Sequence, residues 1–410
     1  MEGLFRDALL AVGLQLFGPL LQQRVDRIDA EFKPKPGQHR VGRRPLEVDT
    51  LFGTARVERD YYTGVGGGHS PADAALALEG STTPALARLV CRAAAQQPYG
   101  AASQDLAAYG AIVIDERQIQ RLVRRIGPAV DPWMKGLAPS AEPLPILYVS
   151  CDGTGTPMRA EELAGRKGKQ ADGSSKTREV KLGAVFTQHR TDEKGRAVRD
   201  HESTTYVGSY ETAFDFSLRL REESRRRGLG NARQVVFISD GARWAEDIGK
   251  DCFAGAASIL DFYHAGERLH ALSESLGGAN PGARAALWKD LLLRDRVAEV
   301  IAQAETLRTQ GVASPEGVEE HLGFIRRHRE RMLYGTYRGN GWFIGSGVVE
   351  AGCRTVVGKR LKQSGMFWSE SGATCVLNFR TLLLSRRLDA FWVDRANAAA
   401  ARNDSLALAA

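Results

Sequence analysis

Two aspartates in this sequence come directly after short apolar runs, and each is followed by a glycine. Asp152 follows the run at residues 146–151, and Asp240 follows the run at residues 234–239. Short runs of β-branched and aromatic residues bounded by glycine predict buried strands. A carboxylate at the end of a buried strand is costly unless a positive charge compensates it. Either Asp-Gly pair alone also fits an ordinary β-turn, but the repeated pattern favours a cation site.

A third carboxylate, Glu350, follows a turn of small residues at positions 344–349 and opens a basic helix expected over residues 351–363. Two strand-end aspartates and one helix-borne glutamate form a ligand set for two divalent metal ions. Carboxylates suit Mg²⁺ or Mn²⁺, and nothing in this set favours zinc. Asp152, Asp240 and Glu350 are therefore the candidate catalytic and metal-binding residues of a site for phosphodiester chemistry.

The residues around these acids resemble one known family. Residues 345–350, the block Arg-Leu-Lys-Gln-Ser-Gly-Met-Phe-Trp-Ser at 360–369 and the motif at 239–244 are similar to the ISKra4 family of bacterial insertion-sequence transposases. The resemblance covers residues 46–388 and is most specific at 345–369. It implies a DDE transposase that binds the terminal inverted repeats of an insertion sequence and catalyses metal-dependent DNA cleavage and strand transfer.

The same resemblance implies an Asp-x-x-His element beside the three acids, which matches residues 261–264. His264 would then be a catalytic residue that orients the scissile phosphate or the leaving group. A histidine where a strand meets a helix is also often a structural residue, so both roles stay open at this point.

The apolar runs predict an α/β core. Strands are expected at residues 146–151, 180–187, 204–208, 234–239 and 258–263, with a helix at 211–226. This order is that of an RNase H-like mixed sheet, in which the first and fourth strands lie side by side. The core is expected at residues 145–268 and 344–393, with an all-helical insertion at 269–343. The polar segment 161–181 is expected to be the tip of a hairpin.

The N-terminal part is expected to be a separate, mainly helical DNA-binding region. Residues 1–44 predict two helices interrupted at Gly18-Pro19 and then a linker, and the helices would either dimerise or pack on their own core. Residues 45–80 predict a small β-hairpin region, in which His69 alone cannot make a zinc site. At the other end of the chain, residues 394–410 are expected to be a flexible tail.

The pattern of apolar and polar residues at 81–130 predicts a helix-turn-helix, with a turn near Gly110 and Asp115 as the N-cap of the last helix. A basic helix of this kind can enter the major groove of DNA, although any surface helix can carry such charges. The candidate DNA-binding side chains on it are Arg117, Gln118, Arg121 and Arg124.

A second group of candidate DNA-binding residues follows Glu350. Basic side chains on this helix would neutralise backbone phosphates without reading the base sequence. Trp368 would either stack on an exposed base or lie in the core. The basic residues of this group are Arg354, Lys359, Arg360 and Lys362.

Bulk properties agree with a nucleic-acid partner. The formal charge of +7 and the isoelectric point near 9.2 favour binding to a polyanion. Five scattered cysteines without a CxxC pair disfavour a thiol-based site. No unbroken apolar run reaches the roughly eighteen residues of a membrane span, and a signal-peptide pattern is not seen. We therefore expect no membrane partner and a bacterial cytoplasmic, nucleoid-associated location.

The expected partners are double-stranded DNA, as transposon ends and target, and further copies of the chain in a homodimer or higher oligomer. Other classes stay open. Asp-Gly-Thr-Gly-Thr at 152–156 resembles the first phosphate loop of actin-like and sugar-kinase-type ATPases, although residues 239–244 match their second loop poorly. A catalytically inactive DNA-binding regulator of the same fold, or a nuclease that only cleaves, would share the same outline.

Overall fold

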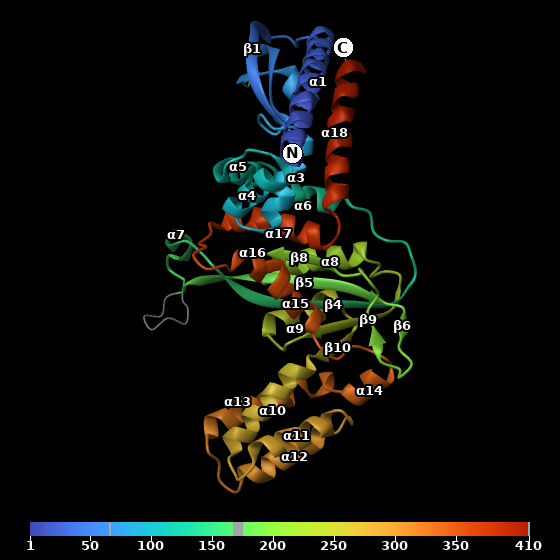
Figure 1. Cartoon of the computed structure of the whole chain (residues 1–410). Helices are drawn as coiled ribbons and strands as arrows, with labels where there is room; N and C mark the ends of the chain where they lie inside the picture. Colours follow the sequence, from blue (N-terminus) through green and yellow to red (C-terminus); the bar gives the residue numbers. More distant parts are fainter. Residues whose placement is uncertain (65–66, 167–174, 409–410) are drawn as a thin grey trace. The chain divides into compact units, whose positions relative to one another are not determined.

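The computed structural model describes residues 1–64, 67–166 and 175–408 (Figure 1). The chain is a mixed α/β protein that divides into two compact units. The central unit comprises Lys135–Phe367, and the N-terminal unit comprises Met1–Met134 together with Trp368–Ala410.

The central unit is built around a five-stranded mixed sheet with the order β10-β9-β4-β5-β8 (Figure 1). The central strand β4 runs antiparallel to β5 and parallel to β9. At the two edges, β8 is antiparallel to β5 and β10 is parallel to β9. The first and fourth strands therefore lie side by side, as the sequence predicts. The strands are β4 (Leu144–Pro157), β5 (Thr177–Gln188), β8 (Thr205–Ser209), β9 (Ala232–Ser239) and β10 (Ala257–Leu260).

Short elements lie between the first and second strands of this sheet and between the second and third. A small ribbon of β6 (Arg190–Thr191) and β7 (Ala197–Val198) follows β5 in the chain. The helix α7 (Ala160–Leu163) lies in the segment expected to be a polar hairpin tip. Residues 167–174 of that segment lie outside the described residues.

Alternation along the strands gives the sheet two apolar faces. On one face Leu147 and Val149 of β4 pack with α8 (Ala213–Arg226) and α9 (Arg243–Cys252). On the other face Tyr148 of β4 stacks on Phe186 of β5 with ring centroids 4.7 Å apart. Asp152 has the same parity as Tyr148, so the pleat directs its side chain to this second face.

The elements described between β10 and Glu350 are helices joined by short loops, which agrees with the predicted helical insertion. Trp288, Leu292 and Leu322 are buried in one cluster with Ile259 of β10, so the insertion shares its core with the sheet. The helices are α10 (Phe262–Leu276), α11 (Pro281–Leu292), α12 (Val297–Arg308), α13 (Pro315–His328), η2 (Arg329–Arg331) and α14 (Tyr334–Gly339).

Side chains at the end of the insertion cover the outer edge of β10, which pairs with β9 alone. Arg331 Nη2 donates to the carbonyl of Ile259 at 3.1 Å, and the Tyr334 hydroxyl donates to the carbonyl of Leu260 at 2.9 Å. These bonds satisfy backbone groups that an edge strand would leave unpaired. They also fix the insertion at the strand end that leads into Asp261.

The N-terminal unit begins with one long helix, α1 (Glu2–Glu31), packed on the hairpin of β1 (His39–Thr50) and β2 (Gly53–Gly64). The predicted hairpin is confirmed, with a two-residue turn because Thr50 pairs with Gly53. A short third strand, β3 (Gly67–His69), pairs with β2.

Two expectations for this region are wrong. The helix does not break at Gly18-Pro19, and residues 39–44 belong to β1 instead of a linker. Leu21 and Val25, beyond the proline, are buried against Val48 of the hairpin. We attribute the continuous helix to this packing, which outweighs the one backbone hydrogen bond that a proline removes.

The helix α1 also has the length and composition of a membrane span. One 18-residue window within it has a mean hydropathy of 1.4, and 6% of that window is buried. Core helices of soluble proteins and signal sequences can have the same length and mean hydropathy, so this observation by itself assigns no membrane role.

The remaining helices of the N-terminal unit come from both ends of the chain. The helix α17 packs against α3 and α5, and its Asn378 and Arg380 donate to the carbonyls of Gly127 at 3.2 Å and Ala95 at 3.1 Å. The helices are α2 (Pro71–Ala75), α3 (Pro84–Gln96), α4 (Tyr99–Gly110), α5 (Glu116–Ile126), η1 (Gly127–Ala129), α6 (Val130–Gly136), which leads into the central unit, α17 (Glu370–Leu384) and α18 (Leu388–Leu408).

The structure differs from the expected boundaries at the C-terminal end. Because α17 packs with the N-terminal helices, the chain after Phe367 is part of their unit and not the end of the core. Residues 394–408 are the second part of α18 and not a flexible tail. Arg395 holds this helix through a 2.7 Å bond to Glu79, and its alanine-rich sequence favours helix.

Candidate active site

Three aspartates stand level across neighbouring parallel strands of the sheet. Ser150 of β4 is in register with Ile238 of β9, so Asp152 and Asp240 come two residues later on each strand. Leu260 of β10 is in register with Ser239 of β9, so Asp261 comes one residue after that pair, as Asp240 does. β9 and β10 end at this level and β4 continues past it, so three carboxylates lie level at the carboxyl ends of β9 and β10.

Asp152 does not end its strand, in contrast to the sequence prediction. β4 continues to Pro157 and pairs with β5 throughout, so the Asp-Gly-Thr-Gly-Thr stretch forms a β-ladder and not a phosphate loop. The glycines suit this arrangement because β5 side chains lie close above them. A Cβ at Gly155 would lie 2.8 Å from the Thr177 hydroxyl oxygen.

The Asp152 carboxylate is partly buried and has few donors. Its Oδ1 accepts from the backbone N–H of Gly153 at 2.6 Å, and it accepts a hydrogen bond from the Cys353 thiol. Burial raises the pKa of Asp152, and the nearby charges of Asp240 and Glu350 raise it further, while the two hydrogen bonds oppose the shift. Asp152 therefore lies within electrostatic reach of both other candidate acids.

Asp240 follows β9 at the predicted position. Its Oδ1 accepts from the backbone N–H of Ala242 at 2.9 Å, which shapes the turn into α9. Gly241 adopts a φ of +88°, and a Cβ there would lie 2.9 Å from atoms of both Leu260 and Phe324. The Asp-Gly pair is therefore a real turn as well as a candidate site.

Glu350 is positioned by the segment that precedes it, residues 341–346. Gln188 Nε2 donates to the carbonyl of Gly341 at 2.9 Å, and the backbone N–H of Phe343 donates to the Tyr148 hydroxyl at 3.3 Å. Two further bonds join the segment to the end of β10. The Phe262 N–H donates to the Ile344 carbonyl at 3.0 Å, and the Ser346 N–H donates to Asp261 Oδ2 at 2.5 Å.

The helix that carries Glu350 overlaps the predicted one at 351–363 but begins four residues earlier and ends two residues earlier. It consists of α15 (Gly347–Gly352), the π-helical η3 (Cys353–Gly358) and α16 (Lys359–Leu361). Gly352 allows close approach to the sheet, since a Cβ there would lie 2.7 Å from Tyr206 Cε1. π-helical turns often occur at functional sites, and this one starts at Cys353, whose thiol bonds Asp152.

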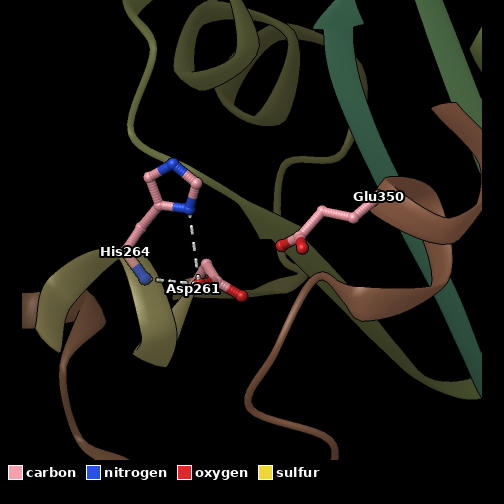
Figure 2. A group of neighbouring side chains, drawn as sticks. All are labelled: Asp261, His264 and Glu350. Carbon is pink, nitrogen blue, oxygen red and sulfur yellow. Dashed lines mark hydrogen bonds and ion pairs between the residues drawn. The ribbon is translucent and has the colours of Figure 1, made fainter. Parts of the chain in front are cut away.

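Figure 2 shows that Glu350 extends toward Asp261 and His264. Ligand atoms of these three residues all lie within 4.8 Å of one another, and they are the one group of this kind in the part of the chain that the structure describes. The Ser346 hydroxyl donates to Glu350 Oε1 at 2.6 Å and holds the carboxylate in this direction. The sequence prediction placed the Asp-x-x-His element beside the three acids, and Glu350 is the acid whose ligand atoms lie with it.

Asp261 organises this corner of the site. It is fully buried, and besides Ser346 it accepts from the backbone N–H of His264 at 2.6 Å as the cap of α10. Burial alone would raise the pKa of Asp261, but hydrogen bonds from His264 and Ser346 outweigh it and lower the pKa. The His264 Nδ1 lies 3.6 Å from Asp261 Oδ1, and this interaction raises the pKa of His264 to about 9. His264 is half-exposed, so it presents a cation to solvent.

Asp152, Asp240 and Glu350 form no ion pair with a basic side chain within the described residues. Their oxygen ligands suit a hard cation such as Mg²⁺ or Mn²⁺. Asp261 is a weaker ligand because both of its oxygens already accept backbone N–H bonds. Asp152 and Asp240 do not belong to the one group of ligand atoms that lie within 4.8 Å of one another in the described residues, so the structure does not bring the three predicted acids to metal-bridging distance as a set. Their carboxylates are of the chemical kind that holds such an ion, and Glu350 is shared between the two sets.

The basic residues after Glu350 separate into exposed and buried groups. Arg354 and Lys359 are exposed, and the Lys362 ammonium is hydrogen-bonded to the hydroxyl of Thr154, two residues from Asp152. The prediction for Arg360 is wrong, because its side chain is fully buried and packs on Met366. Trp368 is also buried, which agrees with its core alternative and not with base stacking.

The predicted DNA-binding helix α5 lies in the N-terminal unit. Asp115 caps it in a capping box: Asp115 accepts from the Gln118 N–H at 2.7 Å, and the Gln118 side chain accepts from the Asp115 N–H at 2.9 Å. Gln118 is thus engaged in the cap. Arg117, Arg121 and Arg124 are exposed at spacings of four and three, which places them on one side of the helix.

Two residues of the site, Ser346 and Cys353, were not predicted from the sequence, and Asp261 was predicted only as the first residue of the Asp-x-x-His element. Asp261 also has a signal in the sequence, because an aspartate where a predicted strand meets a predicted helix is typical of a helix N-cap. The Asp261 side chain then accepts from the N–H three residues later, that of His264. Ser346 and Cys353 have none, because their roles depend on how the Glu350 helix docks on the sheet.

No protein-family model matches the chain, and no characterised protein matches it at a significant level.

Proposed function

We propose that this chain is a DDE-type DNA transposase with an RNase H-like core, of the kind that the ISKra4 resemblance implies. Its substrates are the terminal repeats of a DNA element and a target duplex, and it cuts and joins phosphodiester bonds. The sheet order, with three antiparallel strands followed by two parallel ones, supports this core.

One observation carries the proposal. Asp152 and Asp240 stand level at the same edge of the sheet, and Glu350, 110 residues after Asp240 in the chain, returns to within electrostatic reach of Asp152. The intervening helical insertion is bonded at its end to Ser239 of β9, the residue before Asp240. The charges of Asp240 and Glu350 raise the pKa of the partly buried Asp152, and a function in cation binding accounts for keeping these carboxylates near one another.

In this site Asp152, Asp240 and Glu350 would hold divalent cations. Two such ions supply the activation of the attacking water or 3′-hydroxyl and the stabilisation of the departing 3′-oxygen. Cys353 and Gly153 orient Asp152 by hydrogen bonds, and Ser346 orients Glu350.

His264 would act on the phosphate. Its raised pKa keeps the imidazolium charged at neutral pH, and Asp261 fixes the ring from the Nδ1 side. The other ring nitrogen can then donate to a non-bridging phosphate oxygen. Lys362, Lys359 and Arg354 add positive charge along the adjoining helix for the DNA backbone.

The first experiment tests the acids. Full-length protein is incubated with labelled duplexes that carry the terminal repeats found in the DNA flanking the gene, in the presence of Mg²⁺. Asp152→Asn, Asp240→Asn and Glu350→Gln should each reduce cleavage and joining by at least about 10³-fold. An amide keeps the shape of the side chain but removes the charge that holds the cation, so gel-shift affinity for the duplex should change little.

The matched control is Asp251→Asn, an exposed acid at the end of α9 without a role in the site. It should cleave and join at the wild-type rate. Wild-type joining by Asp240→Asn would contradict the proposal. ATP hydrolysis without DNA would favour an ATPase, and DNA binding without any cleavage by the wild type would favour a regulator.

A second experiment measures the cation directly. Mn²⁺ binding to the wild type, followed by electron paramagnetic resonance, should saturate, and the Asp152→Asn/Asp240→Asn double variant should bind at least about tenfold more weakly. Equal binding by the two proteins would remove these acids from the metal site.

The DNA-recognition helix has its own test. Arg121→Ala and Arg124→Ala should weaken binding to the terminal repeats and lower the slope of log K against log salt by about one each. Arg24→Ala, an exposed arginine on α1, is the control and should bind as the wild type does. Unchanged binding by both α5 variants would contradict recognition by this helix.

A further inference from the structure

The helix α1 has two apolar faces, and one of them is used inside the N-terminal unit. Leu21 and Val25 are buried on the hairpin, and Leu14, Phe17 and Ile28 pack around them. The Phe17 ring lies 5.5 Å from the Phe52 ring at the hairpin turn. Gln22 adds a 2.8 Å bond to the carbonyl of Glu58. This face accounts for the attachment of α1 to its own chain.

The second apolar face is exposed. Its members recur at spacings of four, three, four and four residues, which places them along one side of a helix. They are Phe5, Leu9, Val12, Leu16 and Leu20, with exposed fractions of 67%, 56%, 50%, 65% and 61%. The stripe spans roughly 23 Å at 1.5 Å per residue. It is also free of charge, since residues 8–23 contain no Asp, Glu, Lys or Arg.

We propose that this stripe, Phe5 to Leu20, is a self-association surface and that its partner is the same stripe on a second copy of the chain. A continuous exposed apolar stripe without charges is the composition found at the centre of protein interfaces. Five such side chains contribute on the order of 500 Å² per copy, or about 1,000 Å² in total, which reaches the lower bound of a specific interface.

A lipid bilayer is the other surface that an apolar helix can meet, and two observations disfavour it. The uncharged stretch of residues 8–23 is shorter than the roughly 20 residues that a membrane span needs. The opposite face of the same helix is occupied by the hairpin, which carries ionised groups such as Arg43, paired with Asp26 at 2.5 Å. A second copy covers only the exposed stripe and leaves these polar contacts in water.

Sedimentation velocity of the full chain between 1 and 100 μM, about the range of weak interfaces, tests the pairing. The wild type should form a concentration-dependent dimer. Leu9→Glu and Leu16→Glu should each weaken the dimer at least about tenfold, because each change places two charges in the seam. Both positions are exposed in one copy, so circular dichroism of the variants should match that of the wild type.

Leu4→Glu is the matched control, since Leu4 is exposed on the same helix but outside the stripe. It should dimerise as the wild type does. A second measurement uses Val12→Cys, at the centre of the stripe, which should give an interchain disulfide on mild oxidation, whereas Leu4→Cys should not. A wild type that stays monomeric at 100 μM, or that instead floats with phosphatidylcholine vesicles, would overturn the pairing. Dimerisation is independent of the chemistry proposed above, because loss of the dimer leaves Mn²⁺ binding to a single copy unchanged.

Discussion

Arg331 offers the sharpest test of how the insertion supports the site. Its guanidinium donates to Glu246 Oε1 on α9 and to the Ser239 hydroxyl at the end of β9, each at 2.7 Å. His328 Nδ1 lies 2.7 Å from the same Glu246 oxygen. Arg331 therefore joins the insertion to the residue that directly precedes Asp240.

We predict that Arg331→Met destabilises the central unit by about 3 kcal/mol. The Arg331 and Glu246 side chains are 13% and 11% exposed, and removing one partner of a buried pair costs about 3–5 kcal/mol. The lower end applies because His328 still contacts Glu246. For a unit of this size each kcal/mol lowers the melting temperature by about 2–4 °C, so a loss of about 6–12 °C is expected.

Differential scanning calorimetry of the full chain measures this loss. Arg329→Met is the control, because Arg329 is exposed on the same short helix, and its melting temperature should stay within about 1 °C of the wild type. Arg331→Met leaves the buried Glu246 carboxylate without its arginine partner, and the double variant Arg331→Met/Glu246→Gln removes that negative charge as well. Its loss should be smaller than the sum of the single losses by at least about 1 kcal/mol. A single-variant loss below about 2 °C, or strictly additive losses, would refute the reasoning.

Three further predictions concern stability. Burial lowers the pKa of His328 to about 4, so between pH 4 and 6.5 the unfolded chain binds more protons than the folded chain. The free energy of unfolding, measured by urea titration, should therefore fall by up to about 3 kcal/mol as the pH drops through this window, and His328→Asn should flatten this pH profile. Gly352→Val should cost about 1–3 kcal/mol by the same method, because its Cβ would overlap Tyr206; Gly347→Ala, with open space around it, should not. Asp115→Ala removes the cap of α5 and should cost about 1 kcal/mol, checked by thermal melting.

Local patterns in the sequence determined much of the fold. The β-branched runs before Asp152 and Asp240 predicted two strands, because strand periodicity is encoded over a few residues. Their adjacency followed from the RNase H-like order of the elements and not from either run. The cap at Asp115 and the helical insertion followed from the same kind of local rule. The prediction that Asp152 ends its strand was wrong, since its continuation depends on pairing with β5 about 30 residues later.

Only the tertiary structure decided where the third acid lies, which is beside Asp261 and His264. Glu350 owes its direction to bonds across long separations, such as Ser346 to Asp261 over 85 residues. Arg360 is a basic residue in sequence but a buried one in the fold. A local sequence pattern predicts neither the direction of Glu350 nor the burial of Arg360, because burial and hydrogen-bond partners arise only when distant segments pack together. The sequence thus determined which side chains could do chemistry, and the packing of the insertion against the sheet determined which of them meet.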